Sequence, residues 1–169
     1  EDSREFARRF IAAHFGSDQL GPDLLVALCD SVREEVQAFG REMLTRLAQA
    51  DQAQDFLLRL SQHPSPSMQL HASASLHTVS GDAALIAELE RYFRSVLGRV
   101  NTGGVAKKRV QAFLRAEALG SEDCARVVVA ILDDLSATCS VQDRAAAIET
   151  LVLVKARWPD LDLRLKVAS

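Results

Sequence analysis

The residues best suited to chemistry in this sequence are a run of basic side chains between positions 91 and 116. This window holds seven cations and neither Asp nor Glu. It carries +7, so the rest of the chain carries −10 to give the net charge of −3. A local cationic surface of this kind attracts phosphate or carboxylate groups. The candidate anion-binding or acidic-partner-binding residues are Arg91, Arg94, Arg99, Lys107, Lys108, Arg109 and Arg115.

Some of these cations occupy an unfavourable place. Lys107, Lys108 and Arg109 fall in the first turns of the helix expected after the glycine turn at 103–104. The helix macrodipole is positive there, so each exposed cation costs ~0.3–1 kcal/mol. On a helical projection Lys107, Lys108 and Arg115 share one polar face. Because free N–H groups at a helix start also bind anions, this arrangement indicates a nearby phosphate or carboxylate.

Three explanations of the basic cluster stay open. Its members pair with acidic residues of the next hairpin, such as Glu117, Glu122, Asp133 or Asp134, or form a solvated helix face. Alternatively they bind an acidic protein partner. A third explanation is the phosphate backbone of a nucleic acid, but the rest of the chain is acidic and aromatic residues for base stacking are few.

Sequence signatures of catalysis and nucleotide binding are missing. Gly98 and Gly103 have the outer spacing of a phosphate-binding loop, but Gly104 follows where that loop needs lysine. The dinucleotide-binding, nucleophile-elbow and zinc-protease motifs do not occur. Asp133 and Asp134 are adjacent, and adjacent residues on a helix point in different directions, so they make a poor acid–base couple. The sequence predicts a protein that is not an enzyme and holds no cofactor.

Metal-binding side chains are not spaced as ligands either. The four histidines, at positions 14, 63, 71 and 77, are never three or four residues apart. Cys29, Cys124 and Cys139 are widely separated and odd in number, which favours buried, reduced thiols in a cytoplasmic protein. No apolar stretch approaches the ~20 residues that span a bilayer, so we expect no membrane partner. The polar N-terminus lacks an initiator Met and indicates a fragment of a longer protein.

The composition favours helices throughout. Ala, Leu, Arg, Glu and Gln lose little side-chain freedom in a helix, and Pro and Gly fall at breaks between apolar runs. We expect an all-α fold of about nine helices joined by short connections, with one long helix over 82–100. Apolar and charged residues alternate over 161–169, which predicts an extended C-terminal arm. The Ala-, Arg- and Leu-rich composition is typical of a bacterial protein.

Two segments of the chain repeat at a constant offset. Residues 24–44 and 56–76 align without gaps, and each reads as a helix, a turn and a second helix. The motif that opens the second helix, Val36 to Phe39, recurs as Val110 to Phe113. A fixed period of this length in helix pairs indicates an α-solenoid. The identical pairs are Leu25 and Leu57, Leu28 and Leu60, Gln37 and Gln69, and Leu44 and Leu76.

These elements resemble HEAT or armadillo-like repeats, although an irregular helical bundle is the alternative. The resemblance implies stacked antiparallel hairpins over residues 1–160, followed by the arm at 161–169 or the start of a linker. It also implies a non-catalytic scaffold that binds a protein partner, as part of a larger multidomain protein. Nucleic-acid binding through the basic cluster of residues 91–115 is the second hypothesis, and an enzyme without a recognisable motif is the third.

Overall fold

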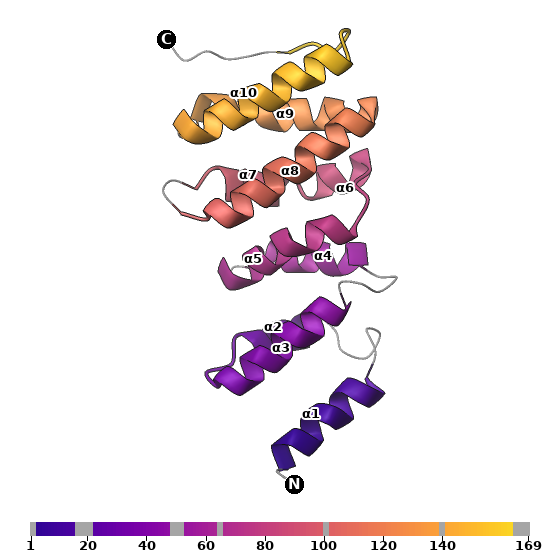
Figure 1. The fold of residues 1–169 in the computed structure, drawn as a ribbon, viewed down its shortest axis with the longest axis vertical. Coiled ribbons are helices and arrows are strands. Elements are labelled where there is room, and N and C mark those ends of the chain that lie inside the picture. Colours follow the sequence, from indigo (N-terminus) through magenta and orange to yellow (C-terminus); the bar gives the residue numbers. More distant parts are fainter. Residues whose placement is uncertain are drawn as a thin grey trace. The chain divides into compact units, whose positions relative to one another are not determined.

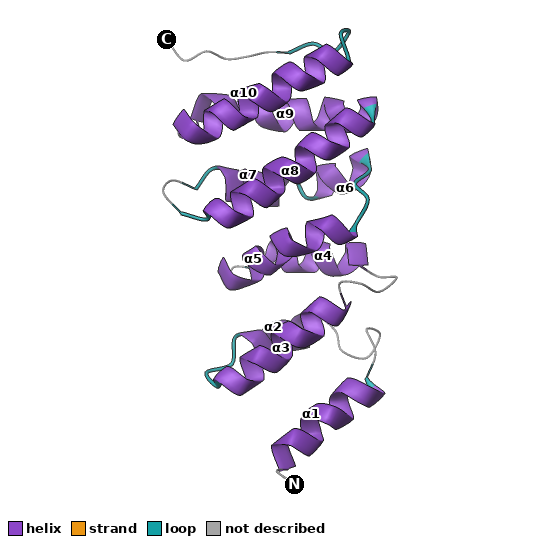
Figure 2. Cartoon of the chain, viewed as in Figure 1, coloured by secondary structure: helices purple, strands orange, loops and turns teal. Residues whose placement is uncertain are grey.

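The computed structural model describes residues 3–15, 22–47, 53–63, 66–99, 102–138 and 141–163. Within these ranges it contains ten α-helices and one short 3-10 helix, and no strand (Figures 1 and 2). The all-α prediction is therefore confirmed. The chain divides into two compact units, Glu1–Thr78 and Val79–Ser169.

The first unit contains five α-helices and the 3-10 helix. Their bounds are α1 (Ser3–His14), α2 (Pro22–Cys29), α3 (Glu34–Leu47), α4 (Ala53–Gln62), α5 (Pro66–Ser75) and η1 (Leu76–Thr78). Helices α2 and α3 form one hairpin, α4 and α5 form a second, and α2 contacts α4. Proline opens both α2 and α5, where its missing N–H costs nothing because a first-turn N–H has no partner inside the helix.

A close approach of backbones holds the first hairpin together. A Cβ atom built on Gly40 of α3 would lie 2.9 Å from both the backbone nitrogen and the Sγ of Cys29 in α2. Glycine at this position lets the two helices approach more closely than any side chain would permit. Leu25 of α2 and Met43 of α3 are buried in the resulting core.

Each of the two hairpins contains a glutamine side-chain hydrogen bond, and the two bonds lie at equivalent positions. The Gln37 side-chain amide of α3 donates to the carbonyl of Ser31 at 2.6 Å. At the matching position of the second hairpin, the Gln69 amide of α5 donates to the carbonyl of His63 at 3.2 Å. The same sequence offset relates the first residues of α3 and α5, Glu34 and Pro66. In each hairpin the glutamine side chain thus satisfies a carbonyl in the turn that leads into its own helix.

The second unit contains the remaining five helices. Their bounds are α6 (Ala83–Glu88), α7 (Glu90–Leu97), α8 (Gly104–Gly120), α9 (Glu122–Thr138) and α10 (Val141–Arg157). Helix α9 contacts α6, α7, α8 and α10, and α8 also contacts α7 and α10. The core between them includes Phe93, Leu114, Ile131 and Leu151, each fully buried. The chain's one tryptophan, Trp158, closes the unit by donating from Nε1 to the Ala118 carbonyl at 2.9 Å.

The prediction of a single long helix over 82–100 is wrong, because the structure has two helices there, α6 and α7, separated at Leu89. Helix α6 is capped by Asp82, whose Oδ1 accepts from the Leu85 N–H at 2.7 Å, and it ends at Glu88. Leu89, fully buried at φ −84° and ψ −1°, separates it from α7. This separation lets α6 lie on α9 while α7 contacts both α8 and α9. Burial of the two apolar faces, one on α9 and the other on both α8 and α9, therefore overrides a helical pattern in which no Pro or Gly lies between Ala83 and Leu97.

The expected C-terminal arm is described only in its first three residues. Leu161 is buried, and its carbonyl accepts from the Lys155 side chain at 2.6 Å. Residues 161–163 form no strand, and the rest of the predicted arm lies outside the described residues.

Candidate functional site

Three of the seven basic residues, Arg94, Arg115 and Lys107, form ion pairs with carboxylates of later helices. Arg94 of α7 bonds Glu90 at 2.7 Å and Asp134 of α9 at 3.0 Å. Burial lowers the pKa of the Arg94 guanidinium, but these two carboxylates outweigh burial and hold its pKa above the ordinary value. Arg115 of α8 bonds Glu149 of α10 at 2.8 Å. The contacts between helices join α7 to α9 and α8 to α10, so each one links helices that are not consecutive in the chain.

Lys107 is buried inside the second unit and is not part of its surface. Its side chain is 8% exposed, and Nζ lies 2.6 Å from Oδ2 of Asp143 in the first turn of α10. Nζ also donates to the carbonyl of Arg99 in the turn before α8. The lysine therefore ties the α7–α8 turn to the start of α10. A buried cation needs such partners because unpaired burial of a charge costs several kcal/mol.

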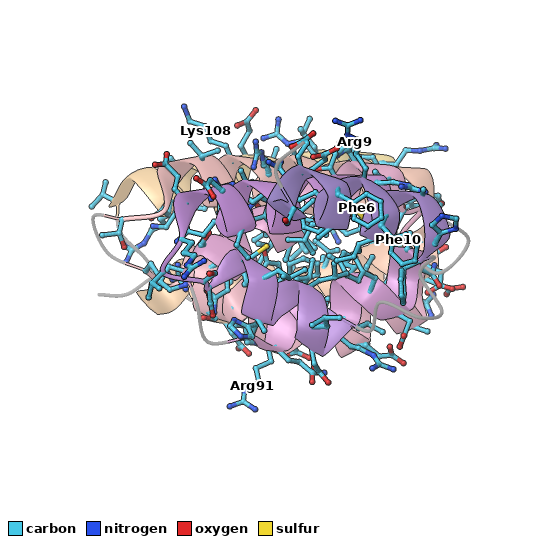
Figure 3. All side chains as sticks on the ribbon, turned by 90° about the horizontal axis from the view of Figure 1, so that it is seen from below. Phe6, Arg9, Phe10, Arg91 and Lys108 are labelled. Atoms are coloured by element: carbon cyan, nitrogen blue, oxygen red, sulfur yellow. The ribbon has the colours of Figure 1, made fainter. Side chains whose placement is uncertain are left out.

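The remaining basic residues do not converge on one surface. Arg91 of α7 and Lys108 of α8 are both exposed, and Figure 3 shows them projecting from opposite sides of the second unit. Arg109 is also exposed on α8, whereas Arg99 is half-buried and its backbone carbonyl accepts from Lys107. The structure therefore places six members of the cluster on α7 and α8 and Arg99 just after α7, without assembling the seven side chains around one ligand.

Other groups with possible chemistry are dispersed or buried. Among the described residues, no cluster of three His, Cys, Asp or Glu side chains could hold a metal ion. Asp133 is buried while Asp134 is exposed, as expected for neighbours on a helix. Burial raises the pKa of the Cys29 thiol to about 11. Cys124 is buried and donates to the carbonyl of Gly81, and Cys139 lies outside the described residues.

Two histidines lie beside a small cavity in the first unit. His71 and His77 line a space of about 100 Å³ together with apolar and hydroxyl side chains of α3, α4 and α5. A space of this size holds a few water molecules. It therefore offers no room for a sizeable substrate.

Helix α10 carries an exposed apolar stripe opposite its buried face. Ala147, Leu151 and Val154 are buried against the unit's core. The other side of the helix is exposed, with Val141 at 81%, Ile148 at 37% and Val152 at 56%. Steps of three or four along the sequence connect the exposed residues and place them in one row along the helix. The α10 stripe consists of Val141, Ala145, Ile148, Val152 and Ala156, all exposed.

Sequence spacing does not reveal the α10 stripe, because it gives the apolar residues of this helix as Ala147, Ile148, Leu151, Leu153 and Val154 without separating buried from exposed ones. The structure buries three of them and leaves Ile148 and Leu153 exposed. The signal was present in the sequence, since apolar residues occur all round this helix. A helix that is apolar all round needs cover on every side.

A second exposed apolar surface lies on α1. Sequence spacing predicts that Phe6, Phe10 and Ile11 form its buried face. In the structure Phe6 is 60% exposed and Phe10 is 45% exposed, while Ile11 is half-buried. The Phe6 and Phe10 rings stack with centroids 6.0 Å apart, and Figure 3 shows them side by side on the helix.

Comparison with known proteins gives no relative for this chain: no protein-family model, no curated protein and no solved structure matches it. In the described part of the chain, none of the helices is long and apolar enough to cross a membrane.

Proposed function

We propose that this chain is a non-catalytic protein–protein interaction module built from HEAT-like helical hairpins, which binds a helix of a partner protein on α10. The repeat is supported by the equivalent glutamine hydrogen bonds of Gln37 and Gln69 and by helix starts at equivalent positions of the two hairpins. Hairpins of this kind stack because one hairpin alone cannot bury its apolar face.

The observation that carries the proposal is the α10 stripe. The helix already buries its opposite side on α8 and α9, so the stripe is not needed to fold the second unit. Contiguous exposed apolar surface on a soluble domain marks an interaction site. From Val141 to Ala156 the stripe is roughly 22 Å long at about 1.5 Å per residue. That length accommodates about four turns of an amphipathic helix laid along it.

Two basic residues along one edge of the stripe favour an acidic partner. Arg144 and Lys155 are separated by close to three full helical turns, which places them on the same edge of α10. A partner helix with carboxylates along one side would meet them while its apolar face covers Ile148 and Val152. Nucleic acid fits this surface less well, because the stripe is aliphatic and three cations of the basic cluster already have carboxylate partners.

The test is capture of partner proteins by chains that differ only at the stripe. A variant carrying Ile148→Glu and Val152→Glu places two charges on the stripe. Ala130→Glu, at an exposed position in the middle of α9, is the matched control. Each immobilised protein is incubated with extract of the source cells, and bound proteins are identified by mass spectrometry. We expect a protein retained by the wild type and the control and lost by the variant, and an unchanged set of proteins would refute the proposal.

A further inference from the structure

Helix α1 is the one described helix of the first unit that belongs to no hairpin. Helices α2 with α3 and α4 with α5 cover each other, whereas α1 places its Arg8 guanidinium 5.7 Å from the centre of the Phe39 ring in α3. Elsewhere α1 and the residue after it expose three phenylalanines. Phe10 lies at the centre of this aromatic face, stacked on Phe6 and edge-on to Phe15.

The edge of this aromatic face is self-complementary in charge. Arg9 and Glu5 lie one turn apart beside Phe6, and the Arg9 Nε to Glu5 Oε1 distance is 3.4 Å. Their side chains are 65% and 50% exposed, so water screens the pair and both charges are accessible from the surface. If two copies of α1 pack antiparallel with Phe6 opposite Phe10, residue 5 of one copy lies about 3 Å along the axis from residue 9 of the other. Glu5 of each copy then reaches Arg9 of the other.

We propose that two copies of this chain associate through α1, as an antiparallel helix pair with two-fold symmetry. Phe6 and Phe10 of each copy pack on Phe10 and Phe6 of the other, and two Glu5–Arg9 ion pairs close the edge. Such an isologous contact is the commonest way in which identical chains associate. It is independent of the α10 stripe, so either surface can exist without the other.

The exposed area determines how strong this contact is. Phe6, Phe10 and Phe15 are 60%, 45% and 37% exposed. At about 200 Å² for a whole aromatic side chain, each copy offers on the order of 300 Å² of aromatic surface. With its polar edges the contact buries roughly 1,000 Å² in total, at the low end for specific interfaces. The dimer is therefore weak and forms only at high protein concentration.

Sedimentation equilibrium over a range of protein concentrations tests the dimer. We expect the wild type to be largely dimeric at about 100 µM and monomeric well below that. A variant with Phe6→Ser and Phe10→Ser stays monomeric throughout, since both side chains are exposed and their loss leaves the fold intact. The control Val32→Ser removes a 99% exposed apolar residue elsewhere in the first unit and leaves the dimer unchanged.

Charge exchange tests the antiparallel geometry. Glu5→Arg and Arg9→Glu each place like charges across the contact, so each variant alone dimerises about five- to thirty-fold more weakly than the wild type. When the two variants are mixed, opposite charges face each other again and a mixed dimer forms. Three results would each overturn the inference: a wild type that stays monomeric at every concentration, a dimer that survives loss of both phenylalanines, or a mixture that associates no better than either variant alone.

Discussion

Replacing Lys107 with methionine removes the charge from a buried ion pair while keeping a long, apolar side chain. Asp143 loses the Lys107 ammonium that lies 2.6 Å away, and the Arg99 carbonyl loses the hydrogen bond that this ammonium donates. Methionine fills most of the same volume, so a cavity contributes little to the effect. The change therefore isolates the electrostatic role of the lysine.

The expected loss follows from the burial of both partners. Removing one member of a buried ion pair costs about 3–5 kcal/mol because it leaves the other charge uncompensated. The Asp143 side chain is 18% exposed, so some water reaches it and the cost falls towards the lower end. We expect Lys107→Met to lower the free energy of unfolding of the second unit by about 3 kcal/mol. Lys108→Met is the matched control, since Lys108 is the exposed neighbour, and it changes stability by less than about 0.5 kcal/mol.

Denaturation in urea, followed by Trp158 fluorescence, measures this effect. Trp158 is the chain's one tryptophan and lies in the second unit, so its emission reports that unit alone. A double-mutant cycle with Asp143→Asn then measures the coupling between the two side chains. The double variant should lose at least about 1.5 kcal/mol less than the two single variants together. A loss below about 1 kcal/mol in Lys107→Met, or no coupling in the cycle, would refute the buried ion pair as a tie between helices.

Three further predictions follow from the structure. Gly40→Ala should lower the free energy of unfolding of the first unit by about 1–3 kcal/mol, because its Cβ meets Cys29 at 2.9 Å; Gly104→Ala, with nothing within 4 Å, is the control, and equal losses in urea denaturation would contradict the close approach. The Cys29 thiol has a pKa raised from 9.0 to about 11, so the folded state prefers the neutral form and loses stability as the pH rises from about 9 to 11. Between these pH values the free energy of unfolding of Cys29→Ala should fall by about 2 kcal/mol less than that of the wild type. Identical pH profiles of stability for both proteins would contradict a raised pKa of the Cys29 thiol. In a mobility shift with duplex DNA at physiological salt we expect no stable complex; a steep salt-dependent complex that Arg91→Glu and Lys108→Glu abolish would instead favour nucleic-acid binding.

The choice of Arg91 and Lys108 for the DNA assay depends on the tertiary structure. Charge reversal at Lys107, which sequence alone would suggest, places an acid beside Asp143 in a buried site. Such a variant tests folding and not ligand binding. The exposed cations are the ones that report on a ligand, since their replacement leaves the core unchanged.

The sequence by itself determined the helices and where most of them begin. Pro22 and Pro66 open α2 and α5, Asp82 caps α6, and Gly103, at φ +74°, precedes α8. These signals act within a few residues, so they can be read along the chain. The constant offset between the two repeated segments likewise indicated where equivalent glutamines would lie.

Only the tertiary structure decided which apolar and charged residues are covered. Lys107 of α8 pairs with Asp143 of α10, which lies 36 residues later in the sequence. Within α10, Leu151 is buried while its neighbour Val152 is exposed. Phe6 and Phe10 look like core residues in sequence but remain open because no second helix packs over them among the described residues. The physical reason is that hydrophobic burial and ion pairing depend on which surfaces meet in space, and spacing along one helix does not specify the neighbour that it meets.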